Sequence, residues 1–481
     1  MCDAVRSDRP PVTRRVPPAD CFIPLAVAVF LIVASAAIFQ TDLHIYDMAR
    51  FMELTLLVAV LPCFILSRQM ASAAIQALGT GTGALLLTMM VVACLSAIMA
   101  ARVSAAIEEL TVNLALVIFG MTLYSAVARH GGRGAADTLL LCLFPLVAFS
   151  ILVRFAYELT AARWLGETFQ WTSPFLSFAN VRFFSQIQAY SLWLMSIPLV
   201  LPILPRRIRW FFFLAAAGFW MLSVLVPSRS VWLSLALSAL CALVIFPRQA
   251  VMTWLRPGVT ALLVGVAGAY ILMESLAAGA PGPREVMAHA GRVADRIELW
   301  TAAASLIAAH PFLGVGPANF PFFHISRFGH PHNVILQIAA EYGLPIAALL
   351  LLVGLRFFMR GVRTVRAESD RTLDSALFAA ITCGLIDAMF SGNNLMPHSQ
   401  IVMVSLVAWF LGRTASRSNG HSDANSVKVT GLIARASACA VWGVLLWTAF
   451  SYYQFVNSND YVLITAGPRF WFDSRSVYYA P

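Results

Sequence analysis

A small set of residues in this sequence could move a proton and hold phosphate. A neutral histidine can take a proton from a hydroxyl group. The planar guanidinium group of arginine donates paired hydrogen bonds that fit the oxygens of phosphate. The residues whose positions point to this chemistry are His332, Asn333, Arg182, Arg229, Arg292 and Arg296.

His332 stands immediately before the expected start of a helix. Asn333 is a favoured N-cap residue, and the helix is expected to end at Gly343 and Pro345. The positive end of this helix and nearby arginines would both disfavour imidazolium and keep His332 neutral. A structural histidine that caps a helix is the open alternative. No Cys, Asp or Glu ligand set accompanies His330 and His332, so we expect no metal site and no cofactor.

Arg292 and Arg296 lie one turn apart on a second expected helix, where both side chains could reach one anion. Proline favours the first turn, so the helix should begin near Pro283 and stop at Pro311. Its expected apolar stripe consists of Val286, Ala290, Val293, Ile297 and Trp300. Asp295 favours a solvated ion pair for Arg292, whereas Arg296 has no acidic residue three or four positions away, so a functional role and a solvated face are equal readings for Arg296.

The composition requires a membrane to surround these elements. Of the 481 residues, 60% are hydrophobic and 12% are charged, and the mean hydropathy is +0.78. Apolar stretches long enough to cross a bilayer as helices recur along the chain. We therefore expect an all-α polytopic bundle of 12 to 13 spans, near 21–39, 51–67, 83–100, 108–126, 137–157, 187–204, 210–226, 231–247, 258–275, 344–359, 374–390, 399–412 and 431–453.

The spans divide the chain into five expected parts. They are a cytoplasmic tail over 1–20, nine transmembrane helices over 21–275, a large external loop over 276–343, further transmembrane helices over 344–455 and a tail over 456–481. Most of the 33 Lys and Arg residues fall on one side of this map, which places the N-terminus in the cytoplasm. The net charge of +10 thus reflects topology and contact with membrane lipids, and nucleic acid is not an expected partner.

Three stretches resemble the superfamily of bacterial O-antigen ligases and O-antigen polymerases. The first is Arg296 with Trp300, and the second is the run from His310 to Gly316. The third is His332-Asn333, followed by Leu336, Glu341 and Gly343-Leu344-Pro345. Upstream, the turn Ser228-Arg229-Ser230 and Arg182 also resemble positions of the family. An apparent extra span and an aromatic periplasmic tail, after about residue 431, fall outside the family pattern.

The resemblance implies a membrane glycosyltransferase of the bacterial inner membrane whose external loop is a periplasmic catalytic loop. It implies an inverting, metal-independent transfer of a glycan from undecaprenyl pyrophosphate to a sugar of lipid A-core. His332 would be the general base, and Arg182, Arg229 and Arg296 would bind the pyrophosphate, with Arg292 a weaker addition. Asn333 is the remaining candidate for substrate contact.

Two groups of alternatives remain open at this stage. An O-antigen polymerase and a ligase that attaches glycans to protein would share the same loop. From another class, a multi-span transporter or flippase would also place Asp387 inside a span. The sequence shows no inverted repeat, which favours the enzyme. For Asp387 we expect pairing inside the bundle, near Asn393 and Asn394.

Overall fold

The computed structural model describes residues 18–36, 45–129, 135–201, 204–276, 293–323, 329–367, 372–415 and 424–457. In these ranges the regular elements are helices. The α-helices are α1 (Pro18–Ala36), α2 (Ile45–Leu66), α3 (Arg68–Ile98), α4 (Val103–Ala128), α5 (Ala135–Leu165), α6 (Val181–Ser191), α7 (Ile197–Val200), α8 (Arg206–Leu225), α9 (Arg229–Ile245), α10 (Arg248–Leu276), α12 (Val293–Ala309), α13 (Phe320–Phe323), α14 (Val334–Tyr342), α15 (Leu344–Ala367), α16 (Thr372–Asp387), α17 (Pro397–Ala415) and α18 (Ala424–Asn457). Two short 3-10 helices, η1 (Ser173–Phe178) and η2 (Leu194–Ser196), flank α6.

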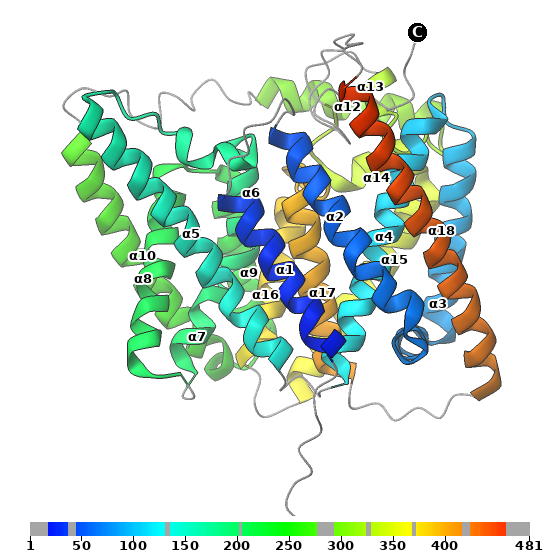
Figure 1. Ribbon diagram of the computed structural model, residues 1–481, viewed down its shortest axis with the longest axis horizontal. Helices are drawn as coiled ribbons and strands as arrows, with labels where there is room; N and C mark the ends of the chain where they lie inside the picture. Colours follow the sequence, from blue (N-terminus) through cyan, green and yellow to red (C-terminus); the bar gives the residue numbers. More distant parts are fainter. Residues whose placement is uncertain are drawn as a thin grey trace, which may run out of the picture.

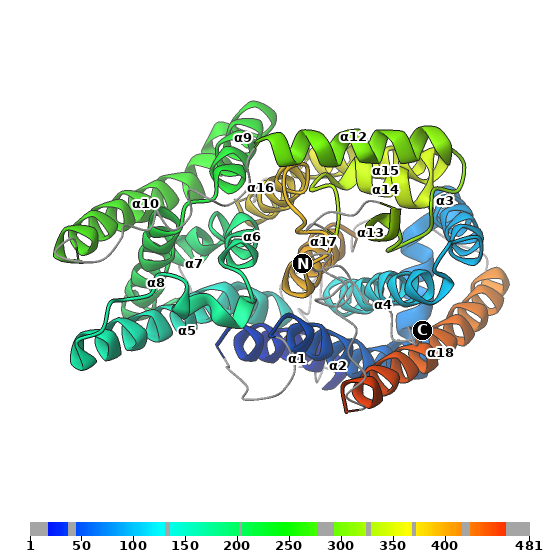
Figure 2. The same ribbon diagram turned by 90° about the horizontal axis from the view of Figure 1, so that it is seen from above.

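The helices form a membrane bundle, which confirms the expected fold class. Most lie side by side along one direction, whereas α12 lies across one end of the bundle (Figures 1 and 2). Among the described residues, seven helices are long and apolar enough to cross a membrane, and three shorter apolar helices accompany them. Each of the thirteen expected spans coincides with a helix, the span near 187–204 being divided between α6 and α7.

The α12 helix is amphipathic, but its buried face differs from the expected stripe. Ile297 is 59% exposed, whereas Leu299 and Ala303 are buried against Phe320 and Ala340. The helix packs on α14. The position of α14 therefore determines that the residues at 299 and 303 are the buried ones. The expected stripe was therefore wrong at Ile297, because the sequence does not reveal the direction from which a partner approaches. Val286 and Ala290 lie outside the described residues.

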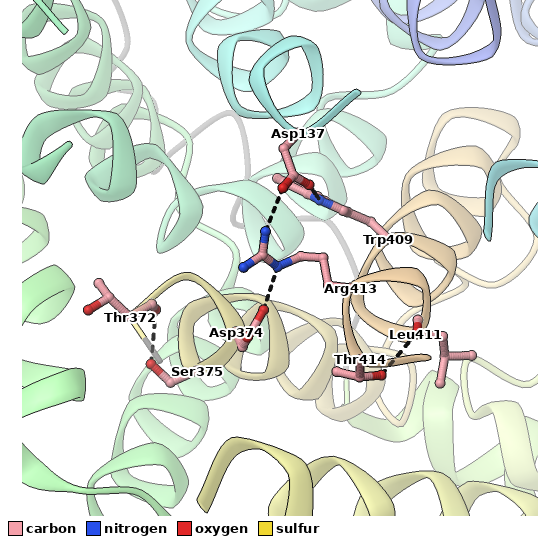
Figure 3. Close-up of polar contacts among 8 residues, drawn as sticks. All are labelled: Asp137, Thr372, Asp374, Ser375, Trp409, Leu411, Arg413 and Thr414. Atoms are coloured by element: carbon pink, nitrogen blue, oxygen red, sulfur yellow. Dashed lines mark hydrogen bonds and ion pairs between the residues drawn. The ribbon is translucent and has the colours of Figure 1, made fainter. Parts of the chain in front are cut away.

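A buried ion cluster joins three helices at the end of the bundle opposite α12 (Figure 3). Arg413, in the last turn of α17, donates from Nη1 to Asp137 of α5 at 2.6 Å and from Nε to Asp374 of α16 at 2.5 Å. The indole N–H of Trp409 donates to the other oxygen of Asp137. Both carboxylates begin their helices, where the helix dipole also favours negative charge. The cluster fixes α5, α16 and α17 relative to one another.

The α16 helix connects this cluster to the opposite end of the bundle. It begins at Thr372, beside Asp374, and ends at Asp387. Asp387 is fully buried and accepts hydrogen bonds from Ser391 at 2.6 Å and from the amide of Asn393 at 3.0 Å. The expectation that Asp387 pairs within the bundle is confirmed for Asn393.

Candidate active site

His332 lies in a tight turn directly before α14, with a backbone conformation that is uncommon for histidine. Its φ is +54°, in the left-handed region. A residue other than glycine held there costs about 1–3 kcal/mol, and such residues cluster at functional sites. The turn is fixed on both sides. The indole N–H of Trp300 donates to the carbonyl of Pro331 at 3.0 Å, and Asn333 begins α14 as its N-cap.

The side chain of Asn333 fastens this turn to the bundle. Its oxygen accepts from the backbone N–H groups of Ile335 and Leu336 at 3.1 and 3.0 Å. Its amide donates to the carbonyl of Met389 at 3.2 Å, just beyond α16. The cap predicted from the sequence is therefore present. Because these contacts are internal, Asn333 acts first as the residue that fixes the position of His332.

The surroundings of His332 keep its imidazole neutral. Burial is the largest cause that lowers the pKa of His332, and the positive charges of Arg296 and Arg182 lower it further, to about 4. Removing water penalises the charged imidazolium form, and a nearby like charge does the same. A neutral histidine and the influence of arginines were expected from the sequence, but burial as the main cause was not.

Two of the four candidate arginines flank His332 from separate helices. Arg182 is the second residue of α6, and its backbone N–H donates to the side chain of Asn180 at 2.9 Å. Arg296 lies in the first half of α12. The two guanidinium groups also interact with each other, since Arg296 lowers the pKa of Arg182 after the larger effect of burial. Two like charges held near a neutral base form a place where an anion would be strongly favoured.

Arg229 borders this group without belonging to its centre. It is the exposed first residue of α9, and Ser228 precedes it as the N-cap residue. The hydroxyl of Ser230, one residue further on, hydrogen-bonds the carboxylate of Asp387, which also interacts electrostatically with Arg296. The link through Asp387 was missed at the sequence level, because residues 230 and 387 are far apart in the chain. Arg292 lies outside the described residues.

The glycine-rich run before α13 packs against the end of α14. Backbone N–H groups of Val315 and Gly316 donate to the carbonyls of Ala340 and Glu341, each at 2.9 Å. The hydroxyl of Ser96 on α3 donates to the carbonyl of Leu313 at 2.6 Å. His332 immediately precedes the N-cap of α14. The hydrogen bonds to Ala340 and Glu341 fix the opposite end of this short helix.

Two glycines in this run are required by close approach. Gly314 has φ +66°, and a Cβ atom there would lie 2.4 Å from the backbone carbon of Glu341. Gly316 has φ +99°, and its Cβ atom would lie 2.2 Å from the Cβ of Ala100, beside the turn between α3 and α4. Only glycine allows both the left-handed conformation and the approach. The spacing that resembles the family signature is thus partly a packing requirement.

Two other arginines, Arg50 and Arg154, make contacts within the protein. Arg50 contacts Glu53 and donates to Gln400 and to the carbonyl of Leu395, each at 2.7 Å. Arg154 donates to the carbonyl of Ser173 at 3.3 Å. These residues join helices within the bundle.

The fold and the site together define a class: a multi-pass membrane protein with a half-buried, neutral histidine near the charges of two arginines at one end of its helix bundle. Residues 190–351 match the family model described as O-antigen ligase. This part of the chain is therefore similar to the O-antigen ligase family, in agreement with the motifs that indicated the resemblance. It covers Arg229, Arg296 and His332 but begins after Arg182. No curated protein matches the chain.

Proposed function

We propose that this protein is an O-antigen ligase of the bacterial inner membrane. It would transfer a glycan from undecaprenyl pyrophosphate to a hydroxyl group of a lipid A-core sugar on the periplasmic face. The observation that carries the proposal is the position of His332, which is half-buried and kept neutral by its surroundings, including the charges of Arg182 and Arg296. The family match over residues 190–351 supports the same reaction class.

In the proposed reaction, the histidine and the arginines have different roles. The acceptor oxygen attacks the anomeric carbon from the side opposite the pyrophosphate, and His332 takes the hydroxyl proton as the new C–O bond forms. The bond between the anomeric carbon and the phosphate oxygen breaks, and its electron pair leaves with undecaprenyl pyrophosphate. Arg182, Arg296 and Arg229 stabilise the charge on the leaving group. Attack from the opposite side inverts the configuration at the anomeric carbon.

The arginines can be tested by an exchange that keeps charge and removes the planar fork. Arg296→Lys and Arg229→Lys should each lower transfer, because lysine cannot donate paired hydrogen bonds to phosphate. Loss of one charge-assisted hydrogen bond, about 1.5–3 kcal/mol, corresponds to a decrease of about 10-fold or more. Lipopolysaccharide from a ligase-deficient strain that carries each variant measures the effect. Arg163→Lys, an exposed residue of α5, is the matched control. Full activity of both site variants would refute forked recognition.

We expect the reaction to proceed without a metal ion. Within the described residues, no group of three or more His, Cys, Asp or Glu side chains is arranged to hold one. Neutralisation of the pyrophosphate would then depend on the arginines. Purified protein should keep its transfer rate in excess EDTA. A rate that falls in EDTA and returns with magnesium or manganese would contradict this expectation.

The acceptor distinguishes the ligase from the alternatives in the same superfamily. In a strain that lacks this gene, a ligase predicts lipid A-core without any attached glycan. A polymerase predicts lipid A-core that carries a single repeat unit. A ligase specific for protein predicts unchanged lipopolysaccharide together with loss of glycosylated protein. Gel profiles of lipopolysaccharide and of glycoprotein from that strain separate the three results.

A further inference from the structure

His330 contacts the proposed general base directly through a hydrogen bond and through its ring. The backbone N–H of His332 donates to Nδ1 of His330 at 3.2 Å. The two imidazole rings meet edge to face with their centres 4.1 Å apart. His330 is 4% exposed. A histidine nitrogen accepts a hydrogen bond only when it carries no proton, so this contact requires the neutral form of His330 with its proton on Nε2.

The segment that follows α16 lies close against the ring of His330. A Cβ atom on Gly392 would lie 2.2 Å from Cε1 of His330. The residue at 392 therefore has to be small for the ring to occupy this position. The Trp300 bond to Pro331 restrains the residue between the two histidines. Together these contacts leave the turn little freedom to move.

We infer that His330 is a positioning residue, which holds His332 in its left-handed turn so that the His332 ring faces Arg182 and Arg296. The inference rests on the proposed function, since it concerns the geometry of the proposed base. The sequence alone indicates no role for His330 beyond an unsupported metal site. In the structure, Nδ1 of His330 accepts a hydrogen bond from the backbone N–H of His332. This N–H group precedes α14 and does not donate to a carbonyl of that helix.

The inference predicts that the acceptor nitrogen matters more than the ring. His330→Phe keeps a planar ring against Gly392 but removes the acceptor. His330→Asn keeps an acceptor near the position of Nδ1 and gives up part of the ring. Since displacement of a catalytic group by about 1 Å can cost up to 10²-fold, we expect His330→Phe to lower kcat by about 10-fold. KM for the donor should change little, and His330→Asn should recover most of kcat.

A second measurement reads the position of His332 without requiring transfer. Histidine-labelled protein in lipid nanodiscs gives the titration of the His332 ring by NMR, assigned by the signal lost in His332→Ala. Burial and the charges of Arg182 and Arg296 lower the pKa of His332 to about 4 in the native turn. A ring released from the turn should titrate closer to the ordinary value of 6.5. We expect this increase in His330→Phe and in Gly392→Ala, but not in His330→Asn.

The two measurements separate failure of the inference from failure of the proposed function. If His330→Phe leaves both kcat and the His332 titration unchanged, His330 does not position His332. Equal loss in His330→Phe and His330→Asn, with an unchanged titration, would also overturn the inference, because the ring alone would then matter. If the titration shifts as expected while His332→Ala transfers normally, the positioning holds and the role of His332 as base is refuted.

Discussion

Replacement of His332 by alanine should lower transfer by about 10²–10⁴-fold, the usual contribution of a general base. The attacking hydroxyl would lose the group that takes its proton, while the arginines that are expected to hold the donor remain. Expression, membrane insertion and donor binding should therefore be nearly unchanged. Single-turnover transfer and donor binding, measured with purified protein, test the two parts separately.

The matched control is His310→Ala, because His310 lies exposed in the same loop region and outside the group around His332. This variant should transfer at nearly the wild-type rate. If the His332→Ala variant transfers normally, His332 would be a structural residue that precedes a helix. The same would follow if the variant lost activity only because it failed to fold. The ring position and the low pKa would then have no catalytic meaning.

The pH dependence of transfer follows from the direction in which the pKa of His332 is shifted. The base must be unprotonated, and its pKa is lowered from 6.5 to about 4. The neutral form therefore persists as the pH falls below 6.5, and it is lost only as the pH passes through about 4. The rate at low donor concentration should stay nearly constant down to about pH 5, where an ordinary histidine would be mostly protonated. A decrease centred near 6.5 would contradict this environment for the base.

The second large effect concerns stability. Arg413→Ala should lower the free energy of unfolding by about 3–5 kcal/mol, because it leaves the buried carboxylates of Asp137 and Asp374 without their shared cation. The variant should also show a clearly lower midpoint of thermal unfolding in detergent. Transfer at low temperature should remain, since the cluster lies at the end of the bundle opposite α12 (Figure 1).

Two comparisons separate this cause from a general loss of surface charge. Arg363→Ala removes an exposed arginine of α15 and should change stability by less than about 0.5 kcal/mol. Combining Arg413→Met with Asp137→Asn and Asp374→Asn should recover part of the loss, because no charge is then left buried without a partner. Equal instability of Arg363→Ala and Arg413→Ala would exclude the buried cluster as the cause.

Much of the fold could be predicted because a bilayer restricts the possible structures. An apolar stretch of sufficient length has to be a helix when no water is available for its backbone groups. Each expected span therefore coincides with a helix. The buried face of α12 could not be predicted in the same way, since Leu299 and Ile297 are both apolar and only the position of α14 decides which is covered.

In the candidate site, too, local features could be predicted from the sequence, whereas contacts between distant residues could not. The cap at Asn333 is local in sequence, and its expected hydrogen bonds to Ile335 and Leu336 are present. A shared role for Arg182 and Arg296 was expected only from the family resemblance, and the sequence did not show that their charges act on the same histidine. The contact between Ser230 and Asp387 depends on α9 and α16 packing together. The role of His330 depends on Gly392, and a single sequence carries no sign of that approach.

The charges that lower the pKa of His332 also make this pKa sensitive to an anion that binds to the same arginines. Arg296 and Arg182 both disfavour the imidazolium form. A polyanion held by these two guanidinium groups would cancel part of that effect and strengthen the base at the moment the site is filled. By linkage, protonation of His332 and anion binding must favour each other by the same factor. The empty protein would thus carry a weak base, and the donor itself would increase the proton affinity that its own transfer requires.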